Sequence, residues 1–329
     1  MESDLKTIVI GTSLTRESDA VVRAGVEIAR ATGAAVRLVH ARAPLPPYAG
    51  LPAELTVEGD WLENQKTVLR RELAQQALRT GLADLDRVER EPGVLAGGLP
   101  HEALVEMAEV TGAGLIVVGA SEKGERRWKP LSSTADRVLR KAPCPVLVVR
   151  PESAFPPKRV VAPVDLSFVS AGALRYGLDL LAETGIEDAE VEVLFILNPI
   201  EAEGSLQFTP AQMARFAADE LSRFVDGNTR DGGATLKRRV RTGYPWEEIL
   251  KELDEQGADL AILGTHGHGR LERLLIGSVT SDVLREARCS VLAVPPTAAL
   301  QEEAAQKITE RARHSADWLF VADEVPAPV

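Results

Sequence analysis

The chain has 329 residues, a length that favours about two domains, and 45% of them are hydrophobic, which is enough for packed cores. Its formal net charge of −11 argues against a general nucleic-acid binder, because such proteins carry a basic face. The chain lacks an apolar run of the ~18–20 residues that span a bilayer, and its acidic first residues do not resemble a signal peptide, so we expect a cytoplasmic protein that binds no membrane.

The first predicted strand, at residues 6–13, is one half of an internal repeat. It matches residues 158–165 at an offset of 152. Farther along the chain, residues 119–149 align without gaps to residues 264–294 at an offset of 145. A single long period of this kind indicates a duplicated domain, whereas a solenoid repeats a short unit many times.

A proline-rich stretch separates the two copies. Pro151, Pro156 and Pro157 lie between the last strand pattern of the first copy and the first strand pattern of the second. We therefore assign residues 1–151 to a first domain, 152–157 to a linker and 158–296 to a second domain. Residues 297–329 have no counterpart in the first copy, and we expect this C-terminal tail to be partly helical.

The second copy alternates apolar strand patterns with helical ones. Strands are predicted at 159–164, 190–197, 235–241, 260–263 and 290–294, and helices at 171–183, 210–225, 246–256 and 278–288. Strands separated by helices of this length imply right-handed crossovers and a parallel sheet that is covered on both faces. The predicted fold is α/β, with two tandem doubly wound domains.

The two cysteines, Cys144 and Cys289, occupy the same position in the two copies. Neither has a second cysteine or a histidine at the spacing of metal ligands, so the sequence indicates no metal site. We expect both to be small buried side chains.

The second copy has a candidate anion site where its first and fourth strands end. Asp165 follows the first strand, and the loop after the fourth strand contains Gly264, Gly267 and Gly277-Ser278. Ligands of doubly wound sheets bind at the carboxyl ends of strands, where the strand order reverses. Glycines let the backbone approach a ligand closely, and a helix that starts at Gly277-Ser278 would attract an anion, with Ser278 as hydroxyl donor and cap. These features predict a phosphate cradle, with Asp165 accepting a hydrogen bond from a ribose hydroxyl or a base amino group.

Competing nucleotide motifs fit less well. A Walker loop needs lysine before the Ser at the helix start, and Gly277 occupies that position. The dinucleotide fingerprint belongs in the first strand-to-helix turn and needs a third glycine, which disfavours NAD. His266 and His268 flank the loop, and either they contact phosphate or, as we favour, they face solvent.

The spacing Gly264-x2-Gly267-x9-Gly277-Ser278 resembles the ATP-binding motif of the universal stress protein family, and residues 288–294 resemble the closing strand of that family. The resemblance implies that Asp165 contacts adenosine and Leu197 lines the adenine pocket. It further implies that the nucleotide is flanked by Leu263 and Gly264 and that its phosphates are held by Gly267, Gly277, Ser278 and Val279. The family fold implies five parallel strands in the order 3-2-1-4-5 per domain. Because family members commonly pair through the last strand, the two copies would mimic a homodimer, and the chain would itself form a homo-oligomer.

The first copy departs from this motif. Glu122 occupies the position of Gly267, Ser132 that of Gly277, and Ser13 that of Asp165. A carboxylate at Glu122 would repel phosphate by about 1–4 kcal/mol, depending on the effective dielectric constant. We therefore predict that the first domain does not bind ATP. The mixed-charge loop at 122–129 is expected to be solvated, with a partner-docking or anion-sensing role as the alternative.

The resemblance implies an ATP-binding stress-response regulator in which the nucleotide, alone or as its magnesium complex, sets conformation or oligomeric state. The sequence places no nucleophile and base beside the loop, so we expect at most slow ATP hydrolysis and no catalytic residues. One alternative is an enzyme of the adenine-nucleotide α-hydrolase type, but residues 162–167 lack the Ser-Gly-Gly loop of those enzymes. Another is an interaction scaffold for a protein partner that binds no nucleotide.

Overall fold

The computed structural model describes residues 5–42, 59–85, 93–96, 99–120, 131–186, 188–198, 209–229, 234–265 and 276–296. Within them the first half of the chain alternates strands and α-helices: β1(Thr7–Gly11), α1(Asp19–Thr32), β2(Ala35–Arg42), α2(Gly59–Thr80), β3(Gly93–Ala96), α3(Pro100–Thr111), β4(Leu115–Gly119), α4(Ser133–Lys141) and β5(Val146–Val149). The second half repeats this alternation: β6(Arg159–Val164), α5(Phe168–Glu183), β7(Glu190–Leu197), α7(Pro210–Asn228), β8(Thr235–Thr242), α8(Pro245–Gln256), β9(Leu260–Gly264), α9(Ser278–Glu286) and β10(Ser290–Val294).

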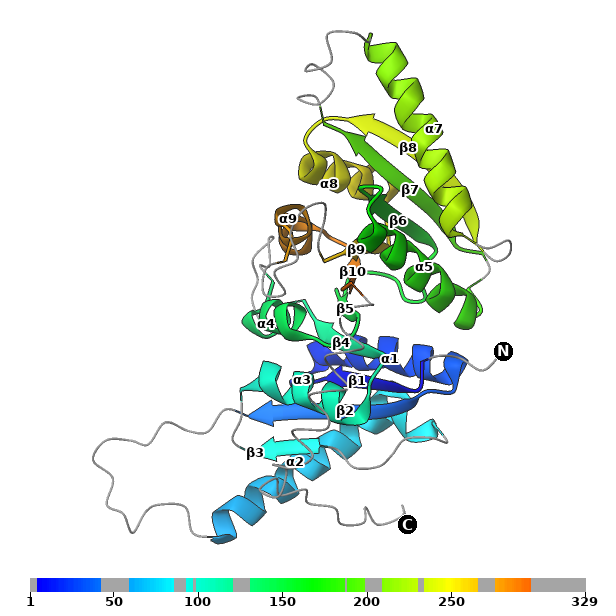
Figure 1. Cartoon of the computed structure of the whole chain (residues 1–329). Coiled ribbons are helices and arrows are strands. Elements are labelled where there is room, and N and C mark those ends of the chain that lie inside the picture. The colour runs from blue at the N-terminus through cyan, green and yellow to red at the C-terminus, as the bar shows by residue number, and fades with distance from the viewer. Residues whose placement is uncertain are drawn as a thin grey trace, which may run out of the picture.

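All ten strands join one sheet, in the order β3-β2-β1-β4-β5-β10-β9-β6-β7-β8 (Figure 1). Within each half the neighbouring strands are parallel. Each half therefore has the strand order 3-2-1-4-5, which confirms the predicted doubly wound fold.

The two halves meet at β5 and β10, which pair antiparallel in the middle of the sheet (Figure 1). Leu147 pairs with Leu292, and these two residues are equivalent in the repeat. The pairing is therefore symmetric about a pseudo-twofold axis, as in a homodimer whose subunits are fused. This pairing satisfies the backbone groups of two strands that would otherwise be exposed sheet edges.

Two apolar cores, one on each face of the sheet, run through both halves. On one face α1, α2, α5 and α7 pack against alternate strand residues such as Ile8 and Leu292. On the other face α3, α4, α8 and α9 pack against the intervening residues, such as Ile116 and Val291. Because successive residues of a strand point to opposite faces, a fully apolar strand supplies both cores.

The cysteines belong to the second of these cores. Cys144 is 7% exposed and Cys289 is 3% exposed. Burial raises the pKa of each thiol to about 12. The prediction of small buried side chains is confirmed.

A cluster of charged residues lies where α8 covers β7 and β8, and we call it the α8 charge cluster. Its members are Glu192, Arg239, Arg241, Glu248, Glu252 and Glu255. Glu252 is fully buried, and it accepts from Arg241 and from Gln256 Nε2 (2.8 Å).

The pKa values of two carboxyls in this cluster are shifted in opposite directions. Burial raises the pKa of Glu192, and its hydrogen bond to Glu252 raises it further. Burial acts on Glu252 in the same sense, but hydrogen bonds from Gln256 and Arg241 outweigh it and hold that pKa below its ordinary value. Of the two carboxyls, Glu252 is therefore the one whose anionic form is favoured, and Arg239 and Arg241 are its charge partners.

Several predicted boundaries differ from the structure. The predicted helix at 171–183 begins earlier, at Phe168, because Ser167 caps it by accepting from Ser170 N at 3.2 Å. The helix predicted at 210–225 continues to Asn228, and the one predicted at 278–288 ends at Glu286. The predicted C-terminal tail and the loop at 122–129 lie outside the described residues. In the part of the chain that the structure describes, we find no helix of the length and apolarity needed to cross a membrane.

Candidate functional site

The carboxyl ends of β6, β7 and β9 lie side by side in the second half. Val161 pairs with Ala261 on β9, and Val164 pairs with Phe195 on β7. Asp165 directly follows β6 and Thr265 directly follows β9, so both lie at the carboxyl ends of neighbouring strands. The chain runs from β6 outward to β7 and β8 before it returns to β9, so the gap between β6 and β9 is the switch point at which doubly wound sheets bind ligands.

Asp165 sits in a strained turn directly after β6. Its Oδ1 accepts from Ser167 N at 3.0 Å and from Ser167 Oγ at 2.5 Å. Leu166, between them, has a φ of 61°, a left-handed conformation that is costly for a branched apolar residue. Leu14 has the same φ at the equivalent position of the first half. The turn therefore holds the Asp165 carboxylate at the start of α5.

The start of α9 is fixed to the end of β9. Gly277 N donates to Thr265 O at 2.8 Å, and Thr280 Oγ1 donates to Gly264 O at 2.7 Å. Gly277 is the N-cap of α9 and makes no side-chain capping bond. The first N–H groups of an α-helix have no acceptor within the helix, so a helix start of this kind favours an anion.

Ser278 does not cap α9, and this part of the sequence prediction is wrong. It is the first residue of the helix, one position after the N-cap, and its side chain is exposed. A side chain bonds back to the second or third helical N–H when it belongs to the residue just before the helix. Ser278 thus remains a candidate phosphate contact through its hydroxyl, while the cap position has no side chain at all.

The first half closes the equivalent helix start with its own side chain. Ser132, the counterpart of Gly277, caps α4 by accepting from Ala135 N at 3.1 Å. Ser132 N donates to Ala120 O at 2.6 Å, the counterpart of the Gly277–Thr265 bond. The two helices are thus anchored alike, but only at α4 does the residue at the cap use one of the helix N–H groups.

The first half also turns its polar groups inward at the end of β1. Thr12 Oγ1 donates to the fully buried Gln76 Oε1 at 2.7 Å and lies 2.9 Å from Ser18 Oγ. Gln76 Nε2 bonds Asp19 at 2.9 Å, and Arg79 Nε bonds the same carboxylate at 3.0 Å. Burial would raise the pKa of Asp19, but these hydrogen bonds hold it below its ordinary value. The polar groups behind this turn are therefore committed to internal bonds.

Four more of the predicted residues fall at the same edge of the second half. Leu197 ends β7 and is 8% exposed, and Leu263 and Gly264 end β9. Val279 is half-buried in the first turn of α9. Gly267, His266 and His268 lie outside the described residues, so their predicted roles stay predictions.

Sequence reasoning missed three residues that shape this site: Leu166, Ser167 and Thr280. A serine three residues before a second serine at a strand end is a recognisable N-cap signal, and it would have located Ser167. The Thr280–Gly264 contact joins residues 16 apart across the loop, and no local pattern indicates it.

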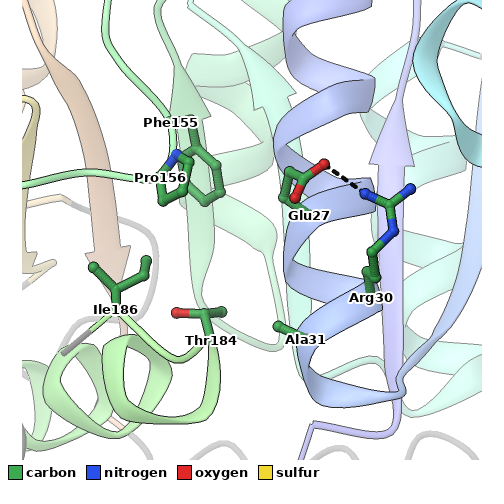
Figure 2. A pocket seen from close by; sticks show the side chains of 7 residues that line it. All are labelled: Glu27, Arg30, Ala31, Phe155, Pro156, Thr184 and Ile186. Atoms are coloured by element: carbon green, nitrogen blue, oxygen red, sulfur yellow. Dashed lines mark hydrogen bonds and ion pairs between the residues drawn. The ribbon is translucent and has the colours of Figure 1, made fainter.

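A cavity of about 230 Å³ lies elsewhere, between the two halves (Figure 2). Its wall is formed by the last turns of α1, by the linker and by the end of α5: Glu27, Arg30, Ala31, Phe155, Pro156, Thr184 and Ile186. Since α1 and α5 each run back from the carboxyl end of a strand, this cavity lies at the amino-terminal edges of the strands. It is therefore separate from the switch point.

Comparison with known proteins gives a consistent result. The universal stress protein family matches residues 4–150 and again 156–295. A universal stress protein of Mycobacterium tuberculosis is 27% identical over 295 residues, which are 87% of this chain and 95% of that protein. One of Methanocaldococcus jannaschii is 30% identical over 142 residues, which are 42% of this chain and 81% of that protein. A crystal structure from Archaeoglobus fulgidus shares the fold at a TM-score of 0.63 and 15% identity, covering 89% of this chain and 99% of its own.

Proposed function

The chain belongs to the universal stress protein family, and from that premise we propose that its second domain binds ATP and that its first domain does not. The observation that carries the proposal is the start of α9, where Gly277 leaves the helix N–H groups uncapped beside the end of β9. A helix N-terminus without a capping side chain favours a phosphate group.

Asp165 supplies the second half of the argument. Asp165 directly follows β6 and Thr265 directly follows the neighbouring strand β9, so one nucleotide would reach both the carboxylate and the helix start. The buried side chains of Leu197 and Leu263 offer an apolar wall for a base. The phosphates would then lie against Gly277, Ser278 and Val279. Mg²⁺ would accompany them if ATP binds as its magnesium complex.

We further propose that ATP acts as a regulatory ligand that shifts the conformation or the oligomeric state of the chain. The second domain is joined to the first through a continuous sheet and two continuous cores. A ligand that favours one arrangement of these elements shifts the population toward it. Light scattering with and without ATP would measure the change in assembly.

Replacing Asp165 by alanine should weaken ATP binding about tenfold or more, because a hydrogen bond to a charged group contributes about 1.5–3 kcal/mol. The measurement is the rise in unfolding temperature across an ATP titration, which reports affinity by mass action. Asp165→Asn keeps an oxygen that can accept from Ser167, so it separates the nucleotide contact from the local turn.

Ser13→Ala changes the equivalent residue of the first domain and serves as the matched control. Its ATP titration should coincide with that of the wild type. If Asp165→Ala binds ATP as tightly as the wild type does, Asp165 has no part in the site.

A further inference from the structure

One side chain of the first domain reaches into the second and touches the helix that begins at the proposed phosphate site. Arg150 directly follows β5 and is 8% exposed. Its Nη2 donates to Leu284 O at 3.1 Å and to Arg285 O at 3.4 Å. Its backbone N donates to Ser290 Oγ at 3.1 Å. Leu284 and Arg285 belong to the last turn of α9, and the last carbonyls of an α-helix have no donor within the helix.

A cation at this end of α9 is favourable for two reasons. It donates to two carbonyls of the last turn, and it lies at the negative end of the helix dipole. Since α9 has only nine residues, it is too short to be stable alone and depends on contacts to keep its place. Its first turn is held by β9 and its last turn by Arg150, so its position is set from both domains.

The contact that Arg150 makes with α9 has no counterpart on the other side of the pseudo-twofold axis. The counterpart of Arg150 in the second domain is Pro295, and the counterpart of Ser290 in the first is Pro145. Proline has neither a side-chain donor nor a backbone N–H, so both components of the contact are missing from the mirror position. Thus Arg150 supports α9, while Pro295 offers α4 no equivalent bond.

This asymmetry coincides with the asymmetry of the two candidate sites. The helix that Arg150 contacts, α9, has glycine at its cap, and the helix without an equivalent contact, α4, has the capping Ser132. We infer that Arg150 is a positioning residue for the phosphate site of the second domain, so that the first domain serves to hold α9 for nucleotide binding. This inference rests on the proposed function.

The test compares three full-length proteins: the wild type, Arg150→Met and Tyr176→Phe. Tyr176 makes another contact between the domains, donating from its hydroxyl to Gly114 O at 2.9 Å, and this bond does not involve α9. Tyr176→Phe is therefore a control for general weakening of the junction. Two quantities are measured: amide hydrogen exchange in α9 without nucleotide, and the ATP dissociation constant.

In Arg150→Met we expect faster exchange in α9 and an ATP dissociation constant raised about tenfold, a usual size for coupling between sites. Tyr176→Phe should leave both quantities close to those of the wild type. Arg150→Lys keeps the charge without the planar fork and should give a smaller loss of affinity; it replaces Arg150→Met in the comparison if that variant does not fold.

Equal ATP affinity in the wild type and in the Arg150 variants, or an equal loss in Tyr176→Phe, would overturn the inference. Failure of the wild type to bind ATP would instead contradict the proposed function. In that case the exchange data still show whether Arg150 holds α9, since they are recorded without nucleotide.

Discussion

Gly277→Glu should abolish tight ATP binding, with a loss of affinity of about a hundredfold. The substitution places a carboxylate at the N-cap of α9, where the phosphates are proposed to lie. Two like charges about 4 Å apart repel by roughly 1–4 kcal/mol, depending on the effective dielectric constant, and the added side chain also occupies the space. Isothermal titration of ATP into the purified variant measures the loss.

The fold should survive this change. Gly277 has φ −55° and ψ 146°, a conformation open to any residue, and an acid near a helix N-terminus is favourable for the helix. Ser132→Glu makes the equivalent change in the first domain and should leave ATP affinity unaltered. An unchanged affinity in Gly277→Glu would remove α9 from the nucleotide site, and a loss in Ser132→Glu would show that the first domain takes part in binding.

Arg241→Met should lower the free energy of unfolding by about 3 kcal/mol, because it removes a charge partner from a buried anion. Arg241 is bonded to Glu252, which is fully buried, and to Glu255 at 2.9 Å. Hydrogen bonds to Glu255 and Glu252 raise the pKa of Arg241, so its charge is permanent. Urea denaturation at neutral pH measures the change in the free energy of unfolding.

The same variant should show a defined pH dependence. In the wild type the pKa of Glu252 lies below its ordinary value of 4.5, so its contribution to stability is present above that pH and is lost as pH falls further. Without Arg241 the Glu252 anion keeps Arg239 and Gln256 as partners but loses one of its two arginines, so its protonation costs less than in the wild type. The gap in stability between wild type and variant should therefore narrow toward acid pH.

Arg238→Met is the matched control on the same strand. Arg238 pairs with Asp226, but both side chains are exposed, at 40% and 67%. Exposed ion pairs contribute about 0–1 kcal/mol, so this variant should unfold nearly as the wild type does. Equal effects in Arg238→Met and Arg241→Met would show that the α8 charge cluster does not act as a buried network.

The sequence predicted the fold well because its strongest signals are periodic and long. The match of residues 119–149 to 264–294 fixed the duplication, and apolar runs such as β4 and β9 marked the buried strands. The strand order followed from the family resemblance. The antiparallel pairing of β5 with β10 confirmed the expectation that the two copies pair through their last strands, as the subunits of a homodimer would.

The finer features depended on contacts between residues far apart in the chain, and these the sequence could not predict. Arg150 forms a hydrogen bond with Leu284, 134 residues away in the sequence, and Arg239 forms one with Glu192, 47 residues away. The burial of Glu192 and Glu252 has no local signal in the sequence, because charged residues are rarely buried. The sequence predicted the N-cap of α9 at Ser278, one residue after Gly277, which is the N-cap in the structure.

The central claim, one nucleotide site per chain in the second domain, is tested most directly by the stoichiometry of ATP binding. Isothermal titration calorimetry would be performed on the wild-type chain after removal of any nucleotide that copurifies. We expect one ATP per chain. No binding would contradict the nucleotide site altogether, and two ATP per chain would contradict the claim that the first domain has lost it.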